Sequence, residues 1–219
     1  MNFRWWTLLL LLSLPFGRLV ISASVPTPER FLRANLGAPD KIEEISYFIA
    51  DGTNVPGFES ADQVLARAAF AAWSRESEGG VRFIEVKSED EAQIRLVWVA
   101  SDQGLFGEMR RFRVGENVGA YVHVMPDVTQ LGSELARYVS KDRLLRDTIV
   151  YLTCVHELGH AVGLQHTRNF ADIMYSFTFG GDIVEYFLRY RRSLNSREDI
   201  LKHSGLSAND IQVLRSLYD

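Results

Sequence analysis

The segment from His156 to His166 constrains this chain more than any other stretch of its sequence. It reads HELGHAVGLQH and has histidine at its first, fifth and last positions. Residues four apart lie on one face of an α-helix, about 6 Å apart along its axis, so His156 and His160 can bind one ion. His166 can join them only if the helix ends near Gly163, whose missing side chain permits the positive φ that reverses a chain.

These residue types at this spacing indicate a catalytic rather than a structural metal site. Three neutral imidazoles leave one position of a tetrahedral zinc ion open, and zinc lowers the pKa of a water bound there to about 7. Glu157 is placed to take a proton from that water and to pass it to a leaving amine. The motif therefore predicts a zinc-dependent endopeptidase with ligands His156, His160 and His166 and with Glu157 as general base and acid.

With Asp172-Ile173-Met174-Tyr175 downstream, the motif resembles that of the metzincin zinc proteases, and among them the matrixins, the type of the matrix metalloprotease catalytic domain. Met174 looks like the methionine of the Met-turn, which in the family lies beneath the zinc ligands as an apolar floor. Gln93 to Leu96 looks like the third strand of the family and Leu206 to Tyr218 like its closing helix. The resemblance covers about residues 41 to 219.

The resemblance implies an α+β fold of the metzincin or zincin-like type. In it, a twisted mixed sheet of five strands carries an active-site helix and a C-terminal helix. It also implies a cleft in which a protein or peptide substrate pairs with an edge strand, and such pairing recognises the backbone of many sequences. We assign this edge to Gly119 to Met125, with the possible contacts Ala120, Tyr121, Val122 and His123. The alternative for His123 is a strand histidine that is simply hydrogen-bonded.

The chain departs from the matrixin pattern in three places. It lacks the cysteine-containing propeptide motif, and only His123 and His203 remain outside the motif for the structural zinc of the family, so we expect one zinc ion. Calcium is possible, although no acidic cluster has a legible loop motif. The stretch from Tyr175 to Gly205 is long. In the family this region walls the specificity pocket, so it narrows substrate choice, docks a partner, or is a solvated surface helix.

Patterns along the rest of the chain predict the other elements. Branched and aromatic residues predict strands at 45–49, 81–86, 94–99 and 119–125, and glycines among charged residues predict a loop at 101–117. Apolar spacing predicts helices at 140–162 and 182–194, a capped helix after Ser207, and a helix after Ser60 whose stripe begins with Val64. The single cysteine, Cys154, permits no intramolecular disulfide, and we expect it to be buried and to point away from the metal.

Residues 1–24 resemble an export signal, with Arg4 before a short apolar run and the small residues Ser22-Ala23-Ser24 near a cleavage site. We therefore divide the chain into a signal peptide (1–24), an extended lead-in (25–42) and a catalytic domain (43–219), and expect a secreted or periplasmic protein. An uncleaved anchor is the alternative; after cleavage we expect no stable membrane insertion. A net charge of −4, with 24 basic and 28 acidic residues spread along the chain, argues against nucleic acid partners. The oligomeric state is left open.

Two other functions remain compatible with these residues. One is a protease dedicated to a single partner protein, suggested by the long stretch after Met174. The other is a catalytically silent, zinc-containing module that binds proteins through the same loop and edge strand. Replacing Glu157 separates the silent module from the enzymes, because binding would persist and proteolysis would not.

Cleavage of the export signal is directly measurable. We expect the exported protein to have lost about its first 24 residues, because the apolar run is too short for a bilayer, which needs roughly 20 apolar residues. Intact-mass spectrometry of the exported protein checks this. A mass that includes residues 1–24 would instead support the uncleaved anchor.

Overall fold

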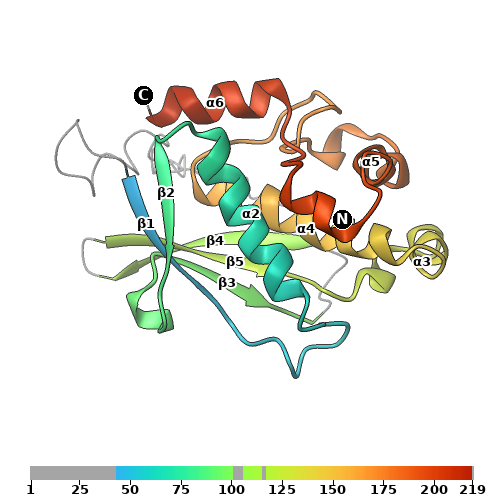
Figure 1. The fold of residues 1–219 in the computed structure, drawn as a ribbon, viewed down its shortest axis with the longest axis horizontal. Coiled ribbons are helices and arrows are strands. Elements are labelled where there is room, and N and C mark those ends of the chain that lie inside the picture. The colour runs from blue at the N-terminus through green and yellow to red at the C-terminus, as the bar shows by residue number, and fades with distance from the viewer. Residues whose placement is uncertain (1–42, 101–105, 115–116, 219) are drawn as a thin grey trace, which may run out of the picture.

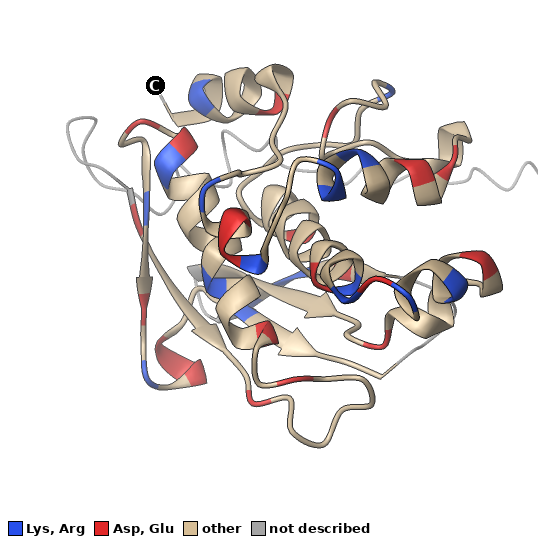
Figure 2. Ribbon diagram, turned by 45° about the vertical axis from the view of Figure 1, so that its right-hand side comes forward, with Lys and Arg blue, Asp and Glu red and all other residues tan. Residues whose placement is uncertain are grey.

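The computed structural model describes residues 43–100, 106–114 and 117–218 of the chain (Figure 1). The predicted signal peptide at 1–24 and the lead-in at 25–42 lie outside the described residues. Within the described part, no helix combines the length and the apolar character needed to cross a membrane. Figure 2 shows basic and acidic residues interspersed over the helices and loops.

A five-stranded mixed sheet forms one layer of the fold, in the order β2-β1-β3-β5-β4. β1, β2, β3 and β5 run parallel to one another, and only β4 runs antiparallel, in its pair with β5. Parallel neighbours need long crossover connections, and helix α2 (Asp62–Glu76) supplies the one between β1 and β2. The strands are β1 (Glu43–Ile49), β2 (Val81–Glu85), β3 (Ile94–Trp98), β4 (Gly107–Val114) and β5 (Asn117–Val124).

Helices α2 and α4 cover one face of the sheet (Figure 1). They are joined in the core by a hydrogen bond of 2.9 Å from the indole N–H of Trp73 to the carbonyl of Val155. The sheet, this central helix and the C-terminal helix confirm the α+β architecture expected from the sequence. The helices after β5 are α3 (Ser133–Val139), α4 (Arg143–Ala161), α5 (Ile183–Arg191) and α6 (Ala208–Tyr218).

The core lies between the sheet and helices α2 and α4. Side chains alternate along each strand, so one face of β3 is buried through Ile94, Leu96 and Trp98 while its other face is partly exposed. On α2 the predicted apolar stripe is buried from Leu65 to Trp73, but Val64, placed in that stripe by its spacing, is half exposed. The side chain of Cys154 is fully buried, as expected for a small apolar residue.

The edge of the sheet differs from the sequence prediction. Residues 101–117 were expected to form a loop, but Gly107–Val114 is the edge strand β4. β5 lies between β3 and β4, so the assignment of a substrate-pairing edge to Gly119–Met125 is wrong. Strand order depends on pairing between distant segments, which periodicity does not report. The residues assigned to that edge, Ala120, Tyr121, Val122 and His123, are therefore interior to the sheet.

A buried ion pair joins the start of α2 to α4. Ser60 and Gln63 were expected to cap α2, but no side chain caps its N-terminal residue. Instead the fully buried carboxylate of Asp62 accepts the backbone N–H of Glu59 at 2.9 Å and a guanidinium N–H of Arg146 at 2.7 Å. Arg146 is itself buried and also donates to the carbonyl oxygen of Gly57. The pair ties α2, α4 and the loop before α2 together.

Removing the buried carboxylate should destabilise the protein far more than removing an exposed one. Asp62→Ala leaves the charge of Arg146 buried without its main partner, which costs about 3–5 kcal/mol. The matched control is Glu44→Ala, whose exposed pair with Arg82 is worth about 1 kcal/mol or less. Urea denaturation followed by fluorescence measures both free energies of unfolding. Equal losses in the two variants would contradict a structural role for the buried pair.

Candidate metal centre and catalytic cleft

Helix α4 carries the first two histidines of the motif. The side chain of Asp142 caps the helix by accepting the backbone N–H of Leu145 at 3.1 Å, and the helix runs to Ala161. His156 and His160 therefore lie one turn apart near its C-terminal end. The helix predicted at 140–162 is confirmed to within three residues at its start and one at its end.

A glycine turn ends α4 and reverses the chain. Gly163 has a φ of 106°, in the region that favours glycine. The N–H of Leu164 donates to the carbonyl of Gly159 at 2.9 Å, and the N–H of Gly163 donates to that of His160 at 3.1 Å. These two bonds form a Schellman motif, which satisfies the last helical carbonyls. The turn predicted from Gly163 is thus present.

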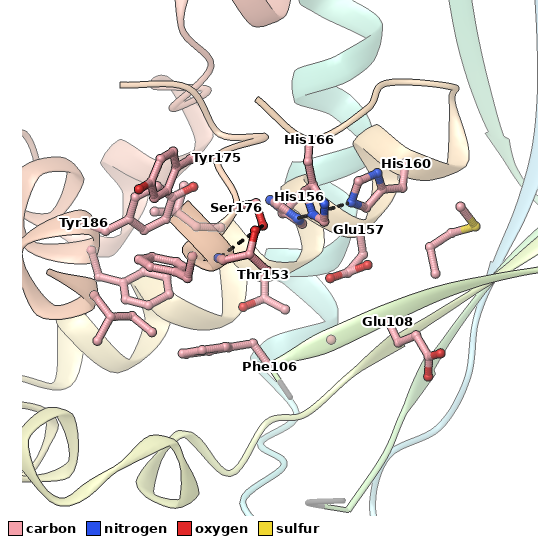
Figure 3. A pocket seen from close by; sticks show the side chains of 17 residues that line it. Phe106, Glu108, Thr153, His156, Glu157, His160, His166, Tyr175, Ser176 and Tyr186 are labelled. Carbon is pink, nitrogen blue, oxygen red and sulfur yellow. Dashed lines mark hydrogen bonds between the residues drawn. The ribbon is translucent and has the colours of Figure 1, made fainter. Parts of the chain in front are cut away.

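The three imidazoles converge on one point (Figure 3). The Nε2 atom of His166 lies 3.2 Å from that of His156 and 3.1 Å from that of His160. Nitrogen ligands at about 2.0–2.1 Å from a tetrahedral zinc ion are roughly 3.3 Å apart, so this spacing fits zinc. Among the described residues, this is the one cluster of three or more side chains that could hold a metal ion.

Backbone carbonyls orient the two helical ligands. The Nδ1 atom of His156 lies 2.6 Å from the carbonyl oxygen of Ile173, and that of His160 lies 3.0 Å from the carbonyl oxygen of Leu164. Because a carbonyl only accepts, each Nδ1 carries the proton and each Nε2 presents its lone pair to the centre. The turn at Gly163 thus also supplies the acceptor for His160.

The surroundings keep the imidazoles neutral. Burial, together with the charge of His160, lowers the pKa of His156 to about 3. Burial also lowers the pKa of His160; the hydrogen bond to Leu164 opposes this, and the charges of His166 and Arg111 lower it further. Neutral imidazole is the form that binds metal, so the site is prepared for a cation at neutral pH.

The carboxylate of Glu157 lies between the histidines and the edge strand (Figure 3). Its side chain is almost completely buried, and burial, reinforced by the charge of Glu108, raises its pKa to about 8. A cation at the histidines would oppose this rise. A Cβ at Gly107 would lie 2.8 Å from the Cγ of Glu157, so glycine at this point lets β4 approach the carboxylate.

Met174 forms the floor beneath the ligands. It is fully buried, and its sulfur packs so closely on α4 that a Cβ at Gly159 would lie 2.4 Å away. Gly159 lies between the two helical ligands in sequence, so the methionine reaches the helix directly below the centre. The role of Met174 as the Met-turn residue stays a prediction.

A pocket of about 520 Å³ opens beside the histidines. Its walls come from the start of β4, from α4, from the segment after Met174 and from α5, and Figure 3 shows these side chains around the opening. Besides the histidines and Glu157, the polar lining residues are Glu108, Thr153, Ser176 and Thr178. The apolar wall consists mainly of Phe106, Leu152, Tyr175, Phe177, Ile183, Tyr186 and Phe187.

Comparison with known proteins identifies this arrangement. The model of the family described as Matrixin matches residues 40–184, about two thirds of the chain and all of the motif. The chain belongs to the matrixin family. Matrixins are zinc metalloproteases, which agrees with the ligand set and with the sheet and helices around it.

Individual relatives are distant. The protein named "Putative matrix metalloproteinase" of Trichoplusia ni ascovirus 2c is 28% identical over 130 residues, which are 53% of this chain and 25% of that protein. The chain thus matches about a quarter of the length of this viral relative. Among solved structures, the archaemetzincin of Methanopyrus kandleri aligns with a TM-score of 0.43 and 16% identity, over 83% of this chain and 98% of its own.

The pocket wall of this matrixin is a packed element. Helix α5, predicted at 182–194, is present and capped by Asp182, and its Tyr186 and Phe187 are buried, so it is more than a solvated surface helix. The hydroxyl of Tyr186 donates to the carbonyl of Ile173 at 2.8 Å, the same oxygen that orients His156. The carbonyl oxygen of Ile173 therefore accepts hydrogen bonds both from the pocket wall and from a histidine of the metal centre.

Sequence reasoning missed several residues of the cleft. Gly107, Met109 and Thr153 come close to Glu157 or line the pocket, but no motif marks them. Position 107 is one of three glycines in a segment interpreted as a loop, which hid its role. His123, considered as a possible substrate contact, instead stacks on Tyr121, with ring centroids 5.9 Å apart. His123 is paired across the sheet with Glu108, so the two side chains lie on the same face. The neighbouring Gly107 faces the cleft, and neighbouring residues of a strand face opposite sides, so His123 points away from the cleft.

Adding one methyl group at Gly159 should weaken the site. Helix propensity alone predicts that Gly159→Ala stabilises the protein by about 1 kcal/mol. The clash with Met174 instead predicts a loss of about 1–3 kcal/mol and zinc affinity reduced about tenfold. Thermal melting and competition with a chromogenic chelator measure these effects, and Gly159→Ala with Met174→Ala should recover part of the zinc affinity. A higher melting temperature with unchanged zinc affinity would contradict the floor contact.

Proposed function

We propose that this matrixin is an endopeptidase that hydrolyses extended segments of proteins or peptides outside the cytoplasm. In the proposal His156, His160 and His166 hold one zinc ion and Glu157 is the catalytic acid and base. One observation carries it: three unprotonated Nε2 atoms converge next to a buried carboxylate at the mouth of an apolar pocket.

The chemistry follows from the positions of these groups. Zinc in such a site supplies Lewis acidity, which polarises a carbonyl and makes water a nucleophile near neutral pH. Glu157 lies next to the ligands and takes the proton that the attacking water loses. The same carboxyl then gives a proton to the amine that leaves. The burial of Glu157 keeps bulk water from competing for these transfers.

The edge strand and the pocket together can hold a peptide. Within the described strands β4 pairs along one edge only, with β5, and its residues Gly107 and Met109 line the pocket. An extended substrate can therefore add to its other edge through backbone hydrogen bonds. We propose the antiparallel orientation of the peptide, which brings the residue after the scissile bond to the pocket. Its apolar wall suits a large apolar or aromatic side chain there.

Glu157→Gln should abolish hydrolysis without releasing the metal. The substitution keeps the shape of the side chain but removes its basicity, so kcat/KM should fall by about 10²–10⁴-fold. Digestion of a mixed peptide library by the zinc-loaded chain, analysed by mass spectrometry, measures activity and cleavage preference. Zinc content of about one ion per chain is measured in parallel, and a chelator should stop the wild-type reaction.

Glu134→Gln is the matched control, because Glu134 is an exposed carboxylate on α3. It should cleave like the wild type. Zinc bound at one ion per chain with no cleavage by the wild type would overturn the general peptidase and favour the dedicated protease or the silent binding module. Cleavage that survives in Glu157→Gln would overturn the role of Glu157 alone.

A further inference from the structure

The edge strand carries a concentration of positive charge beyond the metal centre. Arg110, Arg111 and Arg113 fall within four residues of a chain whose net charge is −4. Because side chains alternate along a strand, Arg111 and Arg113 lie on the same face of β4 as Gly107 and Met109. Gly107 abuts Glu157, and Met109 lines the pocket beside the histidines. This face of β4 is therefore the one turned to the cleft.

Arg111 lies close to the metal centre. Its side chain is partly buried, and it lies two residues beyond Met109, which lines the pocket together with the histidines. Arg113 is two residues further from the pocket and is exposed. A guanidinium stays ionised in such surroundings, so both side chains carry a positive charge on the cleft-facing side of the strand.

Arg110 has a different position on the same strand. It lies on the face of β4 turned away from the cleft, where it is paired with Tyr121 of β5. Its guanidinium is 2.7 Å from the carboxylate of Glu108. Its charge is therefore directed away from the cleft and is largely balanced by its neighbour. Arg110 is a matched internal control for the two cleft-facing arginines.

The order of the pocket-lining residues and the arginines along β4 places the two arginines relative to the scissile bond of a bound peptide. Gly107 and Met109 line the pocket together with the histidines, and the strand then runs on through Arg111 and Arg113. At a rise of about 3.3 Å per residue, Arg111 and Arg113 lie roughly 7 and 13 Å beyond Met109. Those spans correspond to two and four residues of an extended peptide. The arginines thus face the substrate on the side of the scissile bond opposite to the residue in the pocket.

We propose that Arg111 and Arg113 form a cationic subsite that selects peptides with acidic side chains two to four residues before the scissile bond. This inference rests on the proposed peptidase function and names its substrate class. A carboxylate reaches a guanidinium through two parallel hydrogen bonds, a geometry that a neutral amide does not reproduce. Arg111, being partly shielded from solvent, contributes more of the preference than Arg113.

The expected effect is modest and dependent on salt. A partly exposed ion pair changes kcat/KM by about threefold to tenfold between glutamate and glutamine at one substrate position. The Debye length falls from about 10 Å at 0.1 M salt to about 3 Å at 1 M, so the preference should shrink as salt is added. A preference for apolar residues at the same position would not show this dependence.

Matched peptides test the subsite. A peptide cleaved by the zinc-loaded chain is resynthesised with glutamate, glutamine or lysine at each of the four positions before its scissile bond. The ratio of kcat/KM between the glutamate and glutamine peptides is measured for the wild type, Arg111→Gln, Arg113→Gln and the control Arg110→Gln. We expect a ratio of about 3 to 10 for the wild type and Arg110→Gln, near 1 for Arg111→Gln, and partial recovery in Arg111→Lys.

Three results would overturn the proposal: a wild-type ratio near 1 at all four positions, a ratio unchanged in Arg111→Gln, or an equal loss in Arg110→Gln. If the wild type cleaves nothing, the peptidase proposal fails and the subsite is tested by binding. The zinc-loaded Glu157→Ala protein is then used to select peptides from the same library. Enrichment of acidic peptides that is lost with Arg111→Gln supports the subsite, and no enrichment rejects it.

Discussion

The metal centre depends on how the segment from Asp172 to Met174 is held from below. The buried carboxylate of Asp210 accepts the N–H of Ile173 at 2.8 Å and that of Met174 at 3.4 Å. It also accepts the N–H of Ser207, which joins the same network to the start of α6. A buried carboxylate is costly unless such donors surround it, and with them it fixes the segment in one position.

The bonds of Asp210 to Ile173 and Met174 also position the groups that contact these two residues. The carbonyl of Ile173 orients His156, the next side chain forms the floor beneath α4, and the hydroxyl of Tyr186 meets the same carbonyl from the pocket wall. Asp172, fully buried, accepts hydrogen bonds from Ser207 and Asn209 of the C-terminal segment. The C-terminal helix is therefore connected to His156 through two side-chain carboxylates and one peptide carbonyl, although it lies more than 40 residues beyond the motif.

The parts of this molecule that sequence alone predicted are those set by local spacing. The helix that carries His156, its end at Gly163 and the cap formed by Ser207 and Asp210 depend on residues within a few positions of one another. Strand β4 was missed because charged residues fall on both of its faces, so its sequence does not alternate between apolar and polar residues. Only the pairing with β5 defines it. The buried pair of Asp62 and Arg146 was missed for a similar reason, since its partners are 84 residues apart.

The residues for the chemistry of the cleft are close in sequence, whereas those that shape its selectivity come together only on folding. The ligands and Glu157 occupy eleven consecutive residues, so their geometry follows from one helix and one turn. The pocket wall and the peptide edge instead come from α5 and β4, which are far apart in sequence and meet the motif only in the folded chain. The family match ends at residue 184, just inside α5, so most of that helix lies beyond the shared pattern. Arg189 of α5 also donates to the carbonyl oxygens of Phe170 and Asp172. Substitutions on the pocket side of α5, such as at Phe187, can therefore reshape the pocket while the segment that orients His156 stays in place. Losing the Tyr186 hydroxyl instead disturbs both the pocket wall and the bond to the carbonyl of Ile173.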